Sequence, residues 1–331
     1  MRALFFLSGN NTIFAKDEVF SLFESYELKY EIIYDEGQLL ILECSKSNID
    51  FIFRLGLTHF ILDLICDLDI DERINKNISS IDWDSKLSLD RTYKVRVKNK
   101  DKMDYGNLEL SIAKSISNFF KDKIKANLTN PMDEIIGITF KRRLFIGKKI
   151  FERDREGFNI RKPQLRPFFS PTSIDPRIAR AMINISQAQK ETLDPFVGTG
   201  GILIEAGLMG LDTYGLDIEE KSVVGTKVNL LNYEINKFDI RLGDARKILD
   251  IFGRTFESIV TDAPYGRSTK IDKDKEKMYN ECFLSIKESF KRKCIIGLDK
   301  EYSFEDIGFK IDRVYSFRVH KSLVRHLYLL S

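Results

Sequence analysis

The stretch Thr261–Gly266 combines an acid, a proline and an aromatic ring within four residues. A β-rich run precedes Asp262, which places its carboxylate at the carboxyl end of a strand, where ligands bind in open α/β sheets. Pro264 keeps Ala263 extended with its carbonyl turned outward, and Tyr265 offers a flat ring with a polar tip. Together these four residues could hold a planar heterocycle that carries an amino group. A strand-ending turn uses the same residue types, so the stretch alone leaves both interpretations open.

A glycine-containing loop, Asp194–Gly201, follows an earlier predicted strand. Gly198 and Gly200 let the backbone approach a ligand closely, and the helix that follows adds free N–H groups. Leu203 stands where the dinucleotide fingerprint has its third glycine, which argues against a pyrophosphate-binding loop and against a dehydrogenase. The pattern favours a nucleoside cofactor without a pyrophosphate.

Acidic residues also follow the next two predicted strands. Asp217 stands where a ribose-binding carboxylate is found in nucleoside-cofactor folds. Asp244 and Ala245 follow the third strand and could bind an adenine amino group. Each position alone is more often part of a turn. Three successive strand ends with suitable residues favour S-adenosylmethionine as the cofactor.

The composition is that of a globular protein. The chain has 331 residues, 43% of them apolar, and 53 basic against 50 acidic residues give a formal charge of +3. This length suggests two or three domains. No apolar run is long enough for a membrane span and no signal-peptide pattern is present, so a cytoplasmic protein without membrane contact is expected. Four cysteines without a CxxC pair and three scattered histidines predict no metal site.

The order of predicted elements changes near the middle of the chain. Residues up to about 150 form small α+β units, including a hairpin around Gly37 and a helix over 48–57 that Asn48 could cap. After residue 173, strands and helices alternate. That alternation predicts an α/β domain with a doubly wound parallel sheet and an antiparallel edge.

Basic residues are concentrated between the two halves. Residues 141–166 contain ten basic and three acidic side chains. Charge runs are usually solvated surface, but here the run coincides with a proline-punctuated segment between domains, which favours a surface that faces a polyanion. The residues predicted to contact RNA are Arg142, Arg143, Lys149, Arg161 and Arg166.

Taken together, the motifs of the second half resemble those of class I methyltransferases that act on exocyclic or amide nitrogens. The matching residues are Asp194-Pro-Phe-Val-Gly-Thr-Gly, Asp217, Asp244 and Asp262-Ala-Pro-Tyr. The family usually has a proline where Ala263 stands. Because Ala263 still precedes a proline, its extended geometry is expected to survive with some loss of rigidity.

Two further motifs resemble the archaeal tRNA guanine-10 methyltransferases that carry a THUMP RNA-binding domain: Arg166-Pro-Phe-Phe-Ser-Pro and Arg318-Val-His-Lys-Ser-Leu. The resemblance covers essentially the whole chain. It implies a ferredoxin-like domain (1–62), a THUMP domain (63–150), a basic linker (151–172) and a Rossmann-like methyltransferase domain (173–331). It also implies methylation of a guanosine amino group in tRNA, and a small zinc-containing activator protein as a partner.

The resemblance assigns roles to the candidate residues. Asp262 and the Ala263 carbonyl would accept the two N–H bonds of the target amine, Pro264 would aim them, and Tyr265 would stack on the base. The cofactor-binding residues would be Thr172, Ser173, Asp194, Phe196, Gly198, Gly200, Asp217, Asp244 and Ala245.

Two other interpretations stay open at this stage. One is a methyltransferase for guanine in ribosomal RNA or adenine in DNA, which needs the same acid-proline-aromatic signature. The other is an RNA-binding protein whose methyltransferase fold has lost its activity. The sequence also leaves open the modified nucleotide, the number of methyl groups, the need for an activator, the effect of Ala263 and the oligomeric state.

Overall fold

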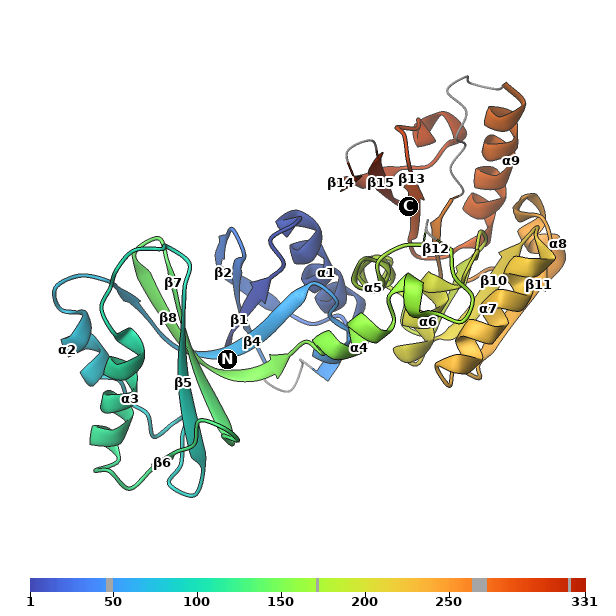
Figure 1. Ribbon diagram of the computed structural model, residues 1–331. Coiled ribbons are helices and arrows are strands. Elements are labelled where there is room, and N and C mark those ends of the chain that lie inside the picture. Colours follow the sequence, from blue (N-terminus) through green and yellow to red (C-terminus); the bar gives the residue numbers. More distant parts are fainter. Residues whose placement is uncertain (46–49, 171–172, 264–272, 321–322) are drawn as a thin grey trace. The chain divides into compact units, whose positions relative to one another are not determined.

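The computed structural model describes residues 1–45, 50–170, 173–263, 273–320 and 323–331. The chain divides into two compact units (Figure 1). Unit 1 comprises Met1–Gly9, Lys29–Asp50 and Thr58–Arg153, and unit 2 comprises Asn10–Leu28, Phe51–Leu57 and Asp154–Ser331. Each unit is described by itself.

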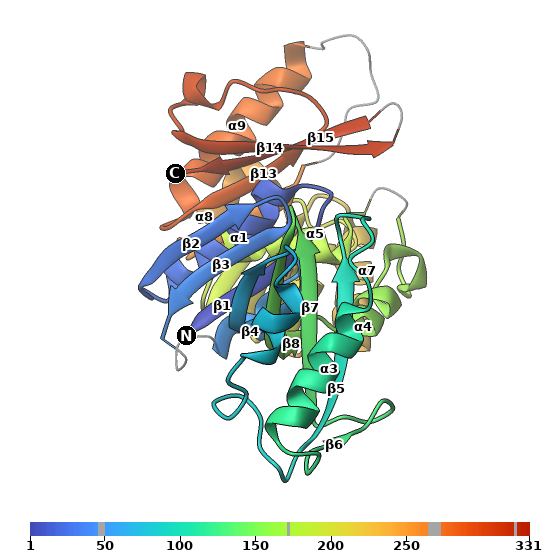
Figure 2. The same ribbon diagram turned by 90° about the vertical axis from the view of Figure 1, so that its left-hand side faces the viewer.

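Unit 1 is built on an eight-stranded sheet of order β2-β3-β1-β4-β8-β7-β5-β6. Its strands are β1 (Arg2–Leu7), β2 (Tyr30–Glu36), β3 (Leu39–Cys44), β4 (Thr58–Asp69), β5 (Thr92–Asn99), β6 (Lys125–Ala126), β7 (Asp133–Phe140) and β8 (Arg143–Glu152). The helices α2 (Ile74–Ser79) and α3 (Leu108–Phe119) cover one face of β5, β7 and β8 (Figures 1 and 2). Because β4 pairs with both β1 and β8, one continuous sheet runs through the whole unit.

Two hairpin turns of unit 1 place residues in the left-handed region. Gly37 between β2 and β3 has φ +55°, which confirms the predicted turn. Lys141 and Arg142 between β7 and β8 also have positive φ, +51° and +59°. Residues other than glycine adopt this conformation at a cost. Asp101 offsets it by accepting hydrogen bonds from both backbone N–H groups, at 2.6 and 3.0 Å.

Unit 2 contains a seven-stranded sheet of order β11-β10-β9-β12-β13-β15-β14. Its strands are β9 (Glu191–Asp194), β10 (Asp212–Asp217), β11 (Phe238–Leu242), β12 (Ser258–Asp262), β13 (Cys294–Leu298), β14 (Ile311–His320) and β15 (Leu323–Leu330). The first five pair in parallel, and β15 pairs antiparallel with β13 and β14. The predicted doubly wound parallel sheet with an antiparallel edge is confirmed.

Helices pack on both faces of this sheet (Figure 1). They are α5 (Pro176–Ile185), α6 (Gly201–Leu208), α7 (Glu220–Asn232), α8 (Ile248–Phe252) and α9 (Lys273–Ser289). One core lies under α6 and α7 and includes Val197, Leu203 and Leu230. The other lies under α8 and α9 and includes Phe256 and Phe283. The carboxyl ends of β9, β10 and β12 therefore meet between two packed layers, which positions the residues that follow them.

Two segments from the first sixty residues are part of unit 2. The first is the helix α1 (Thr12–Ser25), which packs against α5. The second is Phe51–Leu57, which includes most of the short 3₁₀ helix η2 (Asp50–Arg54). Glu18 of α1 is fully buried and accepts hydrogen bonds from the backbone N–H of Gly56 and Leu57, at 2.7 and 2.8 Å, and from the Asn184 amide of α5 at 2.8 Å. One carboxylate thus joins three segments that lie far apart in the sequence.

Several local expectations differ from the structure. The predicted helix over 48–57 is only the 3₁₀ turn η2, and Asn48 lies outside the described residues. Residues 151–172, predicted as a linker, contain α4 (Arg155–Ile160), capped by Asp154, and η3 (Pro163–Leu165). Two more 3₁₀ turns, η4 (Ala245–Lys247) and η5 (Phe304–Ile307), also went unpredicted. Among the described helices, none has the length and hydropathy that a membrane span requires.

Candidate active site

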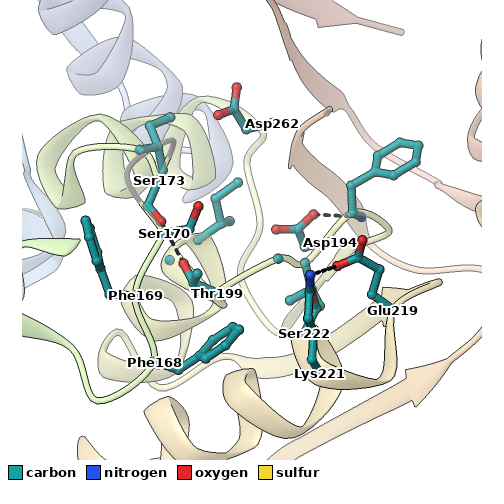
Figure 3. A pocket seen from close by; sticks show the side chains of 16 residues that line it. Phe168, Phe169, Ser170, Ser173, Asp194, Thr199, Glu219, Lys221, Ser222 and Asp262 are labelled. Carbon is teal, nitrogen blue, oxygen red and sulfur yellow. Dashed lines mark hydrogen bonds and ion pairs between the residues drawn. The ribbon is translucent and has the colours of Figure 1, made fainter. Parts of the chain in front are cut away.

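A cavity of about 440 Å³ lies in unit 2 at the carboxyl ends of β9 and β12 (Figure 3). This volume falls within the range of small-molecule sites. Its lining combines three acids, four hydroxyl groups, a lysine and apolar side chains. The lining residues are Phe168, Phe169, Ser170, Ser173, Ile174, Asp194, Phe196, Val197, Gly198, Thr199, Gly201, Ile202, Glu219, Lys221, Ser222 and Asp262.

Asp194 ends β9 and lies at the base of this cavity. Its carboxylate accepts hydrogen bonds from the Thr261 hydroxyl at 2.6 Å and from the Phe196 backbone N–H at 3.1 Å. The pKa of Asp194 is raised to about 7, mainly by burial and also by the negative charges of Asp262 and Asp217, while the two hydrogen bonds act in the opposite direction. Near neutral pH the Asp194 carboxyl group is therefore a mixture of its neutral and ionised forms. A nearby cation would favour its ionised form.

The loop after β9 is shaped by its glycines. Gly198 and Gly200 have φ +51° and +74°, and Gly200 caps α6 in the left-handed conformation. A Cβ at Gly200 would lie 2.8 Å from Thr226 of α7, so a side chain is excluded there on two counts. Asp217 fixes the loop because its carboxylate accepts a hydrogen bond from the Gly198 N–H at 2.9 Å. Asp217 and Gly200 are adjacent to the cavity wall rather than part of its lining.

A buried amide connects the cavity wall to α7. Asn229 donates hydrogen bonds to the carbonyls of Phe168 and Thr199, both at 2.8 Å, and accepts one from the Phe168 N–H at 2.9 Å. Gly225, one turn earlier on α7, leaves room for the Phe168 ring, since a Cβ there would lie 2.1 Å from it. Ser173 and Thr199 share a hydrogen bond of 2.8 Å across the same wall. The segment before α5 is thus held against the glycine loop.

Asp262 ends β12 and is one of the residues that line the cavity, at the edge of the group drawn in Figure 3. It forms an ion pair with Arg325 of β15, at 2.9 Å, in which the two side chains are only 13% and 9% exposed. Ala263 is buried, and its N–H donates to the Gly297 carbonyl at 3.0 Å. Three predicted site residues, Pro264, Tyr265 and Thr172, lie outside the described residues.

The structure places Asp244 and Ala245 outside the cavity lining. Asp244 caps η4 and pairs with Arg246 at 2.6 Å, and the hydrogen bond from that guanidinium lowers the pKa of Asp244. Ala245 is the first residue of η4 and is buried. Among the predicted cofactor residues, the cavity brings together Ser173, Asp194, Phe196 and Gly198.

The predicted RNA contacts fall into two groups. Arg161 and Arg166 of unit 2 are 9% and 4% exposed. Arg161 and Arg180 both pair with the fully buried Glu205 of α6, at 2.7 and 2.8 Å, and Arg166 donates to the Arg161 carbonyl at 3.1 Å. These buried guanidinium groups hold α4 and α5 to α6 and do not face solvent, so we do not include Arg161 and Arg166 in the RNA surface.

The other three predicted RNA contacts belong to unit 1. Arg142 is exposed at the tip of the β7–β8 hairpin. Arg143 pairs with Asp67, and Lys149 pairs with Glu134 and with Glu152. Much of the positive charge of this segment is therefore balanced by acids from elsewhere in the chain.

Several functional candidates were not foreseen from the sequence. Glu219 and Ser222 line the cavity just beyond Asp217, and Arg325 reaches Asp262 from a strand sixty residues further along the chain. The role of Asn229 could have been predicted from the sequence, because an asparagine among the apolar residues of a helix often forms hydrogen bonds with a backbone group. The described residues contain no group of three or more His, Cys, Asp or Glu side chains arranged to hold a metal.

The sheet order, the glycine loop and the acids at the strand ends define a class I methyltransferase. A family model described as an RMKL-like methyltransferase domain matches residues 163–326. TrmN from Thermus thermophilus shares the fold, with a TM-score of 0.60 and 14% identity over 100% of this chain and 99% of that one.

The sequence relatives identify the family. The chain is 37% identical over 315 residues to the tRNA (guanine(10)-N2)-dimethyltransferase of Pyrococcus abyssi, covering 92% of this chain and 93% of the relative. It is 32% identical over 336 residues to the enzyme of that name from Methanothermobacter thermautotrophicus, covering 98% of each. The chain belongs to the family of archaeal tRNA (guanine(10)-N2)-dimethyltransferases, which confirms the family resemblance seen in its motifs.

Proposed function

We propose that this enzyme methylates the exocyclic N2 amino group of guanosine 10 in tRNA with S-adenosylmethionine as the methyl donor. The observation that carries the proposal is Asp262, which lines the cavity at the carboxyl end of β12 and is followed in the sequence by Ala263 and Pro264. The relatives over the full length of the chain carry the name of this reaction.

The cavity suits S-adenosylmethionine by its chemistry. Its glycine loop gives backbone access, Asp194 and Glu219 supply negative charge for a cationic ligand, and Phe196 supplies an apolar wall. We propose that Phe196 and Gly198 line the methionine end, that Ser173 with Thr172 binds its carboxylate, and that Asp217 or Glu219 holds the ribose hydroxyls. Asp244 and Ala245 would hold the adenine, which requires Asp244 to share its acceptors with Arg246. When bound, the cofactor supplies an electrophilic methyl group.

The contribution of the protein is to hold and deprotonate a weak nucleophile. The lone pair of a guanine amine is delocalised into the ring. Asp262 and the Ala263 carbonyl accept its two N–H bonds, which favours a pyramidal nitrogen whose lone pair points away from them. The nitrogen would become cationic as it takes the methyl group, whose bond to the cofactor sulfur breaks to leave a neutral thioether, and one of its protons would then pass to the Asp262 carboxylate. Positioning and electrostatics supply most of the rate, while Tyr265 stacks on the flipped base.

The raised pKa of Asp194 predicts that cofactor affinity depends on pH. A cationic ligand favours the ionised carboxylate, so binding releases a proton and the affinity rises from pH 6 to pH 8, by about three- to tenfold. Without ligand, unit 2 loses stability as the pH rises from about 4 to about 7, because the unfolded chain releases this proton first. Calorimetry of cofactor binding at three pH values measures the effect. Asp194→Asn is the matched control and should abolish the pH dependence; an unchanged dependence in that variant would assign it to another group.

We propose that unit 1 carries the RNA-binding surface, with the THUMP part (63–150) inside it. The proposed ferredoxin-like part (1–62) is divided, because Asn10–Leu28 and Phe51–Leu57 belong to unit 2, and most of residues 151–172 belong to unit 2 together with the catalytic domain (173–331). Arg142 is exposed in the two-residue turn between β7 and β8, and its positive φ is that of a tight hairpin turn. Neutralising Arg142, Arg143 and Lys149 should weaken tRNA binding at least tenfold and flatten its salt dependence. Arg142→Ala should account for most of the loss, since acids already balance Arg143 and Lys149. Filter binding across a salt series tests this surface. If the triple variant bound tRNA at low salt as tightly as the wild type, the RNA-binding surface would lie elsewhere.

Unit 2 also offers a surface for a protein partner. Val224, Val228 and Leu231 lie on one side of α7 and are 55%, 46% and 55% exposed. Exposed apolar residues in a row are typical of interaction sites. We propose that a small zinc-containing activator protein binds this surface. We also propose that the enzyme acts in the cytoplasm. Failure of the two proteins to co-elute in size-exclusion chromatography would remove this partner.

Mass spectrometry of nucleosides tests the proposed reaction. An unmodified tRNA transcript is incubated with the enzyme and cofactor and digested to nucleosides. N2-methylguanosine or N2,N2-dimethylguanosine is the expected product, and the ratio of the two gives the number of transfers. Methyladenosine as the product would favour a different substrate base, and no methylated nucleoside would favour an inactive RNA-binding protein.

A further inference from the structure

We propose that Arg325 is a positioning residue for methyl transfer, which holds the Asp262 carboxylate in its productive orientation and ionised state. The inference rests on the proposed role of Asp262. The Arg325 guanidinium lies 2.9 Å from the Asp262 carboxylate, and both side chains are largely buried. Charge-assisted pairs that are shielded from water hold their geometry far better than exposed pairs.

The sheet provides the path between these two side chains. Asp262 of β12 is in register with Gly297 of β13, which is in register with Leu327 of β15. Arg325 lies two residues before Leu327 and therefore on the same face of the sheet. A Cβ at Gly297 would lie 2.5 Å from the Asp262 carboxylate and 3.1 Å from the Leu327 side chain. The missing side chain at Gly297 leaves room for Asp262 above β13, where Arg325 reaches it from the strand beyond.

The helix α1 covers the part of the sheet that carries Arg325. Phe317 of β14 is the cross-strand neighbour of Arg325. The Phe14 ring of α1 packs edge-on against Phe317, with ring centroids 5.0 Å apart, and against Tyr315 at 4.7 Å. Asp17 of α1 accepts a hydrogen bond from the Tyr315 hydroxyl at 2.7 Å. The N-terminal helix thus excludes water from the face of β14 and β15 on which the ion pair lies.

The ion pair between Arg325 and Asp262 affects the reaction because the target nitrogen gains its positive charge only during methyl transfer. The amine is neutral before transfer and cationic afterwards, so a carboxylate that is already ionised and aimed at it stabilises the transition state more than the ground state. A neighbouring guanidinium favours the ionised form of a carboxyl group. Arg325 thereby keeps Asp262 available as a hydrogen-bond acceptor first and as a proton acceptor only after the nitrogen carries positive charge.

Steady-state kinetics with tRNA, together with calorimetry of cofactor binding, tests the inference in five variants. Arg325→Met should lower kcat about 100-fold, while KM for tRNA and the cofactor Kd change less than about threefold. Arg325→Lys keeps the charge and should recover about tenfold of that loss. Gly297→Ala keeps both charges but displaces the carboxylate, and should give the same kinetic signature. In an Asp262→Asn background, Arg325→Met should cost less than about threefold, because its effect acts through Asp262.

Arg292→Met is the matched control, since Arg292 pairs with Glu257, just before the start of β12, at 3.3 Å; its kcat should equal that of the wild type. If Arg325→Met does not fold, the comparison of Arg325→Lys and of Gly297→Ala with the wild type decides. A wild-type kcat in Arg325→Met or Arg325→Lys, or an undiminished loss in the Asp262→Asn background, would overturn the inference. Absence of transfer by the wild type would instead count against the proposed function.

Discussion

Asp262→Asn should lower the rate of methyl transfer about 10³-fold and change cofactor affinity less than about fivefold. The amide keeps one oxygen acceptor at nearly the same place, but it cannot take a proton and carries no charge to stabilise the cationic nitrogen. The cofactor wall contains Asp194, Phe196 and Gly198 from other elements, so it survives the substitution. Single-turnover transfer to tRNA measures the chemical step, and calorimetry measures the cofactor separately.

Asp299→Asn is the control for this prediction. Asp299 directly follows the neighbouring strand β13 and does not line the cavity, so its substitution should leave the rate within about twofold of the wild type. A rate for Asp262→Asn within tenfold of the wild type would remove Asp262 from the mechanism. Loss of cofactor binding in that variant would assign it to the cofactor site instead.

Glu18→Ala should destabilise unit 2 by about 3 to 5 kcal/mol, although residue 18 is far in sequence from every residue of the cavity. The substitution leaves the N–H groups of Gly56 and Leu57 and the Asn184 amide without the acceptor they now share. Each buried donor without a partner costs about 1 to 3 kcal/mol. The hydrogen bond that Arg54 donates to the Asn184 side chain, at 3.2 Å, should weaken as well, because Glu18 no longer holds that side chain in place. Urea unfolding, monitored by hydrogen exchange of the amides of unit 2, measures the decrease in its free energy of unfolding.

Glu24→Ala supplies the comparison within the same helix. Glu24 is exposed and accepts a hydrogen bond from the Gln187 side chain, so its removal should cost less than about 0.5 kcal/mol. Equal effects of the two substitutions would mean that α1 is not an integral part of unit 2. A fragment that begins at residue 173 should likewise fail to fold stably, because it lacks α1 and the Phe51–Leu57 segment.

The periodic elements of unit 2 could be predicted because their residues report on local geometry. In unit 1, Gly37 has the positive φ that its hairpin position indicated; in unit 2, the positive φ of Gly198 and Gly200 was not predicted, although both were expected to bring the backbone close to a ligand. Alternation of strands and helices after residue 173 predicted the parallel sheet, since short connections leave few topologies open. Asp194 and Asp262 are brought to one cavity because the carboxyl ends of β9 and β12 are neighbours in that sheet.

Long-range pairing was not accessible in the same way. The segment with Arg161 and Arg166 has the composition of a charged surface, but Glu205 and the α4–α6 packing place these side chains inside unit 2. The membership of α1 in unit 2 depends on Glu18 meeting Gly56 and Asn184, and no local pattern encodes that contact. The ion pair of Arg325 with Asp262 depends on strand order and on the absence of a side chain at Gly297.

Comparison of two tRNA transcripts that differ only at nucleotide 10 shows whether the exocyclic amino group of that guanosine accepts the methyl group. One carries guanosine, and the other carries inosine, which lacks the exocyclic amino group that Asp262 and Ala263 are proposed to hold. Methyl incorporation is followed with labelled cofactor, and binding of both transcripts is measured as a check on folding. We expect N2-methylated guanosine in the first transcript and no incorporation in the second, while the enzyme binds both transcripts equally. Equal incorporation into both transcripts would contradict it.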